Sequence, residues 1–308
     1  MAAVDTKVYL SGLELKNPII PASGTFGYGY EATEFYDINK LGSISLKGTT
    51  RKPQNGNPLP RIAEYSSGMI NAVGLENHGI HWLVEEGLPK LADVFDDKVI
   101  ANISGDSIEN YVYCCELVNQ CDSVGIIEVN VSCPNVDKGK LLFGVSTQMV
   151  GELIRAIKSV TTKPIYVKLT PNDTNIVDIA ATCAMNGADG LVLINTLKGM
   201  RIDLKTHKPI LSNTIGGCSG PAIFPVALRM VYDVYKEKLN IPIIGVGGIT
   251  NPEDVMEMML AGADAVQIGT ANLIDPWACE KIVDALPEVM EEYKVKSLRK
   301  IVGGAHNG

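Results

Sequence analysis

Short apolar runs rich in β-branched residues recur along the chain and predict eight buried strands. Near-continuous apolar runs of this length are typical of parallel strands covered on both faces. The runs are 18–23, 43–49, 99–104, 125–132, 165–170, 190–196, 241–248 and 265–270. Most are followed by a stretch with helical periodicity, at 78–94, 107–121, 147–160, 173–186, 221–239, 251–261 and 275–293. This alternation predicts an α/β fold, a (β/α)8 TIM barrel, with a doubly wound parallel sheet as the second possibility.

The segment 50–77 interrupts this alternation. It holds Pro53, Pro58 and Pro60 and shows no helical pattern until about His78. A long irregular loop in a compact domain is usually functional, so we expect a lid or a wall over the C-terminal mouth of the barrel. No linker, repeat or low-complexity tract divides residues 1–308, and a single domain is therefore expected.

Charge and cysteine content exclude several classes of protein. The 27 basic and 35 acidic residues give a net charge of −8, which argues against a nucleic-acid partner. No apolar run approaches a membrane span, and the charged N-terminal segment does not have the pattern of a signal peptide. Seven cysteines without a C-x-x-C pair suggest neither disulfides nor a metal site, and reduced thiols fit a cytoplasmic protein.

Polar residues stand near the ends of four predicted strands, namely Asn102, Asn130, Lys168 and Asn195. The C-terminal ends of barrel strands meet at one mouth, where barrel enzymes have their active sites. Each buried polar group without a partner costs about 1–3 kcal/mol, so four together predict a ligand. Lys168 alone could reach water along its stem, but beside three amides an anion or an electron-rich ring is the better partner. Lys47 lies nearer its strand end, where a solvated lysine is the simpler interpretation.

Two glycine pairs predict a phosphate site. Gly247-Gly248 ends the seventh predicted strand, and Gly269-Thr270 ends the eighth, where barrels commonly bind phosphate through backbone N–H groups. The run 216–220 (GGCSG) precedes a helix and could wrap the same ligand. Glycine turns alone are weak indicators, because many loops need a positive φ. From the residues alone, a phosphorylated flavin fits this predicted phosphate site well, and a sugar phosphate would also fit it.

Cys133 leaves the fourth predicted strand between Ser132 and Pro134. Most cysteines are small buried hydrophobes, and this interpretation applies to Cys114, Cys115, Cys121, Cys183 and Cys279 more readily than to Cys133 with its polar neighbours. A free thiol is only about 3% thiolate at pH 7, so a catalytic base here requires a tuned environment or coupled proton transfer.

The order of several motifs resembles that of the dihydroorotate dehydrogenase family over nearly the full length. The motifs include KNPIIPASGTFGYG, NAVGLENHG, IEVNVSCPNV, YVKLTPN, INTLKGMRIDLKTHKPIL, GGCSGPAIFPVALRMV, IPIIGVGGI and AVQIGTANL. IDLKTHKPIL and SGPAIFPVALRMV are similar to the NAD-linked class rather than to the fumarate-linked one. The membrane-bound quinone class, which uses a serine base, is less similar. Cys218, Glu76 and His78 depart from the usual pattern.

The resemblance implies one FMN per chain and a role for each matching residue. The implied FMN contacts are Ser23, Lys47, Gly48, Asn102, Asn130, Lys168, Ile194, Gly220, Gly247, Gly248, Gly269 and Thr270. The implied substrate contacts are Lys47, Asn71, Ala72, Val73, Gly74, Leu75, Asn130, Asn195 and Thr196. Cys133 is the implied catalytic base, and no metal is implied.

The implied reaction oxidises dihydroorotate to orotate in pyrimidine (UMP) biosynthesis. Cys133 would take a proton from C5, FMN would take a hydride from C6, and Lys168 would stabilise negative charge on the reduced flavin. The chain has no cysteine set for a cluster and no G-x-G-x-x-G motif. NAD reduction is therefore expected on a partner subunit that carries FAD and a [2Fe–2S] cluster, in a heterotetramer of two of each chain.

Three alternatives have distinct signatures. A dihydropyrimidine dehydrogenase-type subunit would prefer a pyrimidine without the carboxylate. A fumarate-linked homodimer would use fumarate without a partner. A non-redox barrel enzyme acting on a sugar phosphate would bind no flavin.

Overall fold

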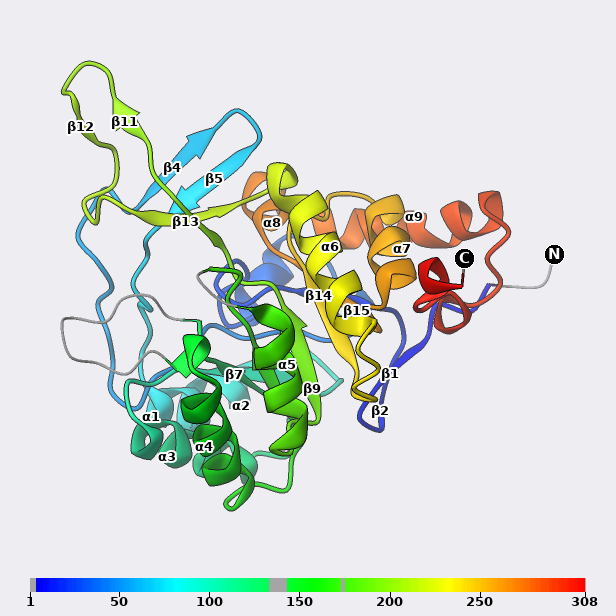
Figure 1. Ribbon diagram of the computed structural model, residues 1–308, viewed down its shortest axis with the longest axis horizontal. Coiled ribbons are helices and arrows are strands. Elements are labelled where there is room, and N and C mark those ends of the chain that lie inside the picture. The colour runs from blue at the N-terminus through cyan, green and yellow to red at the C-terminus, as the bar shows by residue number, and fades with distance from the viewer. Residues whose placement is uncertain (1–3, 133–142, 173–174, 308) are drawn as a thin grey trace.

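The computed structural model describes residues 4–132, 143–172 and 175–307, and a parallel sheet forms its centre. Seven strands are hydrogen-bonded in the order β3-β15-β14-β9-β8-β7-β6 (Figure 1). They are β3 (Ile19–Pro21), β15 (Ala265–Ile268), β14 (Ile243–Val246), β9 (Gly190–Leu193), β8 (Ile165–Lys168), β7 (Val124–Asn130) and β6 (Val99–Ile103). Nearly all of their residues are buried, as the apolar runs predicted.

Residues 42–49 supply the eighth position and close the barrel. On one side the N–H of Ser45 donates to the carbonyl of Pro21 in β3 at 3.2 Å. On the other side the N–H of Leu46 donates to Ile100 in β6 at 2.9 Å, and parallel bridges join 45 to 100 and 49 to 103. The predicted (β/α)8 barrel is therefore confirmed, and the open doubly wound sheet is wrong. The closing segment is held by isolated bridges rather than by a continuous ladder.

Helices surround the sheet at the predicted places. They are α1 (Ile80–Trp82), a π-helical turn over Leu83–Gly87, α2 (Leu88–Ala92), α3 (Ile108–Asn119), α4 (Thr147–Lys158), α5 (Ile176–Met185), α6 (Phe224–Tyr235), α7 (Pro252–Ala261) and α9 (Ala278–Glu292). Side chains of Ser107, Ser146 and Asn251 cap α3, α4 and α7 by accepting a backbone N–H of the first turn. Among the described helices, none is long and apolar enough to cross a bilayer.

Several small elements flank the barrel. The hairpin of β1 (Val8–Leu10) and β2 (Leu13–Leu15) lies near the chain's beginning, and β11 (Ile202–Asp203) pairs with β12 (Lys208–Pro209) in a protruding hairpin (Figure 1). α8 (Thr270–Ile274) follows β15 directly. The 3-10 turns are η1 (Tyr30–Glu34), η2 (Ile38–Lys40), η4 (Phe143–Val145), η5 (Pro221–Ile223), η6 (Leu298–Lys300) and η7 (Gly304–His306).

A four-stranded antiparallel sheet stands over one side of the mouth, in the order β10-β13-β5-β4 (Figure 1). Its strands are β10 (Leu197–Gly199), β13 (Gly216–Ser219), β5 (Gly68–Asn71) and β4 (Ile62–Tyr65). The interpretation of 50–77 as wholly irregular is therefore wrong, because the segment contains β4 and β5. These strands were not predicted because β5 pairs with β13, which lies about 150 residues away in the sequence. In this pairing Gly217 lies opposite Asn71. The expected wall over the mouth is confirmed.

Candidate active site

A cavity of about 540 Å³ opens at the C-terminal ends of the barrel strands, within the usual range for small-molecule sites. Every predicted contact residue in the described part of the chain lines it. These are Ser23, Lys47, Gly48, Asn71, Ala72, Val73, Gly74, Leu75, Asn102, Asn130, Lys168, Ile194, Asn195, Thr196, Gly220, Gly247, Gly248, Gly269 and Thr270. Cys133 lies outside the described residues. The structure thus brings segments from the whole chain to one place, while the role of each residue stays a prediction.

The cavity floor combines a buried cation with a hydrogen-bond acceptor. Lys168, at the end of β8, is 6% exposed, and its Nζ lies 3.0 Å from Oε1 of Gln267 and 3.1 Å from Oε1 of Glu128. Asn102, on β6, donates from Nδ2 to the same Glu128 oxygen at 2.5 Å. Its Oδ1 is buried and has no hydrogen-bond partner among the described residues. The alternative that Lys168 merely reaches bulk water is wrong, because its ammonium is paired inside the barrel.

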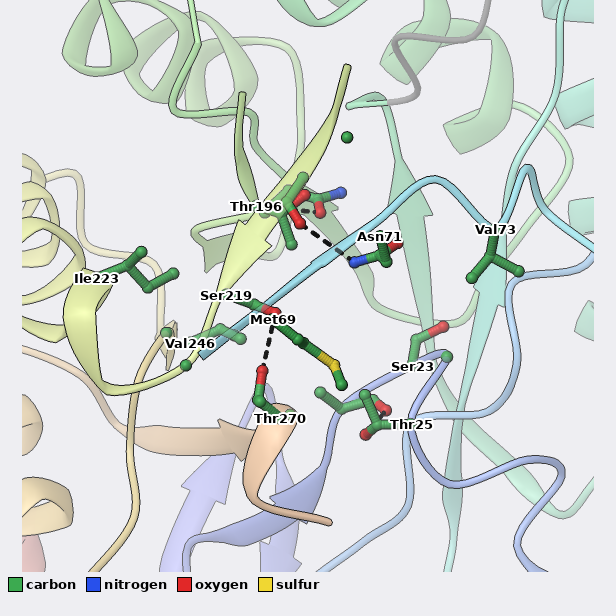
Figure 2. A pocket seen from close by; sticks show the side chains of 18 of the residues that line it. Ser23, Thr25, Met69, Asn71, Val73, Thr196, Ser219, Ile223, Val246 and Thr270 are labelled. Carbon is green, nitrogen blue, oxygen red and sulfur yellow. Dashed lines mark hydrogen bonds between the residues drawn. The ribbon is translucent and has the colours of Figure 1, made fainter. Parts of the chain in front are cut away.

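Three asparagines line another part of the cavity. Asn195 donates from Nδ2 to Oδ1 of Asn130 at 3.3 Å, and the backbone N–H of Ser132 donates to the same oxygen at 3.1 Å. Asn71 reaches the cavity from β5, and its Nδ2 lies 3.4 Å from the carbonyl of Gly217 on β13. Figure 2 shows Asn71 close to Thr196. These amides offer both donors and acceptors to a planar polar ligand.

A second cation, Lys47, comes from the closing segment of the barrel. Burial lowers the pKa of the Lys47 ammonium below that of an ordinary lysine. The nearby Arg61 guanidinium lowers this pKa further, whereas the Glu76 carboxylate, which pairs with Arg61, raises it. A partly desolvated ammonium at the mouth can attract a carboxylate strongly, because less water screens the interaction. Lys47 is half-buried and lines the cavity, and its role there stays a prediction.

Glycines beyond β13 and β14 form a cradle. Gly220, Gly247 and Gly248 have φ values of 105°, 135° and 76°, which side-chain-bearing residues rarely adopt. A Cβ on Gly248 would lie 2.7 Å from the backbone nitrogen of Phe224, so the cradle has no room for one. Thr270 donates from Oγ1 to Ser219 at 2.8 Å and links the end of β15 to β13 (Figure 2). Backbone without side chains at the cavity surface suits a phosphate group.

Sequence reasoning missed the layer below the floor. Glu128, Gln267 and Ser45 are fully buried polar residues inside the barrel and are absent from the predicted site. Polar residues at strand ends point to a mouth, whereas these residues lie deeper in the barrel. The signal was present: Glu128 stands two positions before Asn130, so both point to the same face of β7. Within residues 4–132, 143–172 and 175–307, no group of three potential metal ligands occurs.

A sequence profile of the family described as "Dihydroorotate dehydrogenase" matches residues 5–290. The chain belongs to the dihydroorotate dehydrogenase family. It is 51% identical over 298 residues to a protein of Halalkalibacterium halodurans, with 97% of each chain covered. It is 50% identical over 301 residues to a protein of Enterococcus faecalis, covering 98% of this chain and 96% of that one. Both relatives are named "Dihydroorotate dehydrogenase B (NAD(+)), catalytic subunit".

A solved structure adds the same result for the fold. The dihydroorotate dehydrogenase of Eimeria tenella, crystallised with ferulenol, superposes with a TM-score of 0.80 at 22% identity. The match covers 99% of this chain and 89% of that chain. The resemblance predicted from the motifs, including the NAD-linked class of dihydroorotate dehydrogenases, is therefore confirmed.

Proposed function

We propose that the chain oxidises dihydroorotate to orotate in pyrimidine synthesis, with one FMN in the described cavity and NAD⁺ as the final acceptor. The observation that carries this proposal is the floor, where Asn102 and the buried ammonium of Lys168 both contact Glu128, and Oδ1 of Asn102 has no hydrogen-bond partner among the described residues. An acceptor next to a cation suits a flavin ring, which presents an N–H and gains negative charge on reduction. The NAD-linked relatives at about 50% identity support the same reaction.

The residues present fit FMN at both of its ends. The floor offers Asn102 and Lys168 to the ring, and the glycine cradle of Gly220, Gly247 and Gly248 leaves backbone open to the phosphate. The apolar side chains of Ile194 and Val246 also line the cavity and would contact the ring. When bound, FMN supplies the redox chemistry by accepting a hydride from C6 of dihydroorotate.

The polar wall suits the substrate. Lys47 would attract the carboxylate, and the amides of Asn71, Asn130 and Asn195 would pair with the carbonyl and N–H edges of the pyrimidine ring. Both strand β5 and the loop after β9 would thereby fix the ring in one orientation. Positioning the reacting carbon in this way lowers the entropic part of the barrier.

Cys133 would act as the base that removes the proton from C5. It directly follows Ser132 in the sequence, and Ser132 lines the cavity. Proton loss to Cys133 and hydride loss to FMN together convert the saturated C5–C6 bond of the substrate to a double bond.

Electrons would leave the chain through a partner. The relatives' names contain the words "catalytic subunit", which imply a second subunit in those proteins. We propose that the partner here is an iron–sulfur flavoprotein carrying FAD and a [2Fe–2S] cluster, that two copies of each chain form a heterotetramer, and that the complex is cytoplasmic.

An anaerobic titration tests the function. Dihydroorotate added to the FMN-loaded chain should bleach the visible flavin absorbance, whereas dihydrouracil, which lacks the carboxylate, should bleach it far less. NAD⁺ should reoxidise the flavin only after the partner subunit is added, and fumarate should not do so. A chain that binds no FMN, or FMN that dihydroorotate leaves oxidised, would contradict the proposal.

A further inference from the structure

A fully buried carboxylate lies under the cavity floor and does not line the cavity. Four side-chain donors converge on the two oxygens of Glu128. Oε1 lies 2.5 Å from Nδ2 of Asn102 and 3.1 Å from Nζ of Lys168. Oε2 lies 2.5 Å from Nε2 of Gln267 and 3.2 Å from Oγ of Ser45. These donors come from β6, β8, β15 and the closing segment, so the carboxylate joins opposite sides of the barrel.

The carboxylate dictates how both neighbouring amides are turned. An ionised carboxylate accepts hydrogen bonds but donates none, so it takes the NH2 end of each amide. Asn102 must therefore direct its Oδ1 away from Glu128, and this is the buried atom that has no partner among the described residues. Gln267 must likewise present Oε1 elsewhere, and that oxygen accepts from Lys168 at 3.0 Å.

The same carboxylate balances the charge of the floor. Lys168 donates from Nζ to Oε1 of Gln267 at 3.0 Å, and the same ammonium forms an ion pair with Oε1 of Glu128 at 3.1 Å. A buried ammonium without a counter-ion would be strongly destabilised. Glu128 thereby stabilises the buried ammonium of Lys168, while its own carboxylate does not line the cavity.

We propose that Glu128 is a positioning residue that fixes the hydrogen-bond polarity and the charge of the flavin-facing floor. Acting through its neighbours, it presents an acceptor at Asn102 and a donor cation at Lys168. A ligand edge with an N–H next to a carbonyl or ring nitrogen matches this pattern. This inference rests on the proposed function, because it names FMN as the occupant, but it concerns a residue that does not touch the cofactor.

The test replaces the carboxylate with its isosteric amide in Glu128→Gln. An amide cannot accept at both ends, so Asn102 or Gln267 must turn, and Lys168 loses its counter-ion. We expect the Kd for FMN, measured by quenching of free-flavin fluorescence, to increase at least tenfold. Because a negative charge is removed near the reduced flavin, we also expect a more positive midpoint potential. A tenfold tightening of reduced relative to oxidised FMN corresponds to about 30 mV for a two-electron couple.

Control variants separate this effect from general damage. Asp264→Asn removes a carboxylate at the opposite end of the barrel, where Asp264 accepts from the N–H of Ile243 at 2.9 Å, and it should leave Kd and potential unchanged. The exchange variant Glu128→Gln/Gln267→Glu keeps one carboxylate and one amide in the network and should recover most of the FMN affinity. It also serves as the test if the single variant does not fold, since loss of FMN binding in a folded exchange variant would contradict the proposal.

The outcomes are distinct. Wild-type Kd and potential in Glu128→Gln would overturn the inference, and so would a potential that moves in the negative direction or an equal shift in Asp264→Asn. Failure of the proposed function looks different, because the wild-type chain itself would then not bind FMN.

Discussion

The side-chain amide of Asn195 reaches across β8 and donates to Oδ1 of Asn130 at 3.3 Å, so it links residues at the ends of β9 and β7. Both side chains line the cavity, and the link fixes how each amide is presented there. We expect Asn195→Ala to raise the KM for dihydroorotate about two- to twelvefold, the effect of losing one hydrogen bond of about 0.5–1.5 kcal/mol. Steady-state kinetics measure this. Asn186→Ala, which changes an amide outside the barrel, should leave the KM unchanged, and equal kinetics in both variants would contradict the assignment.

The ion pair of Lys168 and Glu128 predicts that substitutions of these two residues change the free energy of unfolding and the affinity for FMN in different ways. Lys168→Met leaves the Glu128 carboxylate without its counter-ion, so we expect the free energy of unfolding to fall by about 3–5 kcal/mol. FMN binding should weaken at least tenfold. The double variant Lys168→Met/Glu128→Gln should recover stability in denaturant titrations but not FMN affinity. Wild-type FMN affinity in Lys168→Met would remove this lysine from the cofactor site.

Lys47 predicts an alkaline limit to substrate binding. Burial lowers the pKa of its ammonium, so the charge is lost at a lower pH than in an ordinary lysine. As pH rises through that lowered pKa, attraction for the substrate carboxylate disappears and the Kd for orotate should increase. Titration of the FMN-loaded chain with orotate over a pH series measures this. Lys47→Arg should bind orotate with a Kd that stays constant to higher pH, and identical profiles for the two proteins would refute the role of Lys47.

For the proposed base, the expected result is loss of turnover without loss of binding. A serine hydroxyl is a far weaker acid than a thiol, so Cys133→Ser should lose most dihydroorotate turnover near neutral pH while it retains FMN and orotate. Cys218→Ser is the matched control, because burial raises the pKa of that thiol on β13 and no role is assigned to it. Unchanged turnover in Cys133→Ser would exclude the thiol from the mechanism.

Asp264 makes stability depend on pH. Burial raises its pKa to about 6, although the bond from Ile243 opposes the shift. Between about pH 4 and pH 6 the folded chain therefore holds a proton that the unfolded chain has released, so stability falls as pH rises through this window. Relative to Asp264→Asn, the wild-type free energy of unfolding should drop by about 2 kcal/mol from pH 4 to pH 7. Urea titrations measure this difference, and a constant difference across the range would refute it.

The sequence predicts the barrel well because each strand is a local apolar run whose burial needs no distant partner to be recognised. It does not predict the antiparallel sheet at the mouth, because β5 and β13 are short and pair over about 150 residues. The same distinction holds in the site. Strand-end residues such as Asn102 and Lys168 could be placed at one mouth from topology alone. Their shared partner Glu128 lies on the same face of β7 as Asn130, but its contacts with Gln267 and Ser45 depend on the register across the barrel, which topology alone does not give.

The barrel is closed by residues 42–49, the closing segment, which is held by isolated bridges rather than by a continuous ladder. This segment carries Lys47 and Gly48, which line the cavity. A molecule bound in the cavity would contact the closing segment and also its two neighbours, β3 through Ser23, which follows that strand, and β6 through Asn102. Such a molecule would hold these three segments together where the barrel closes. The cofactor-loaded chain would therefore resist unfolding more than the empty chain.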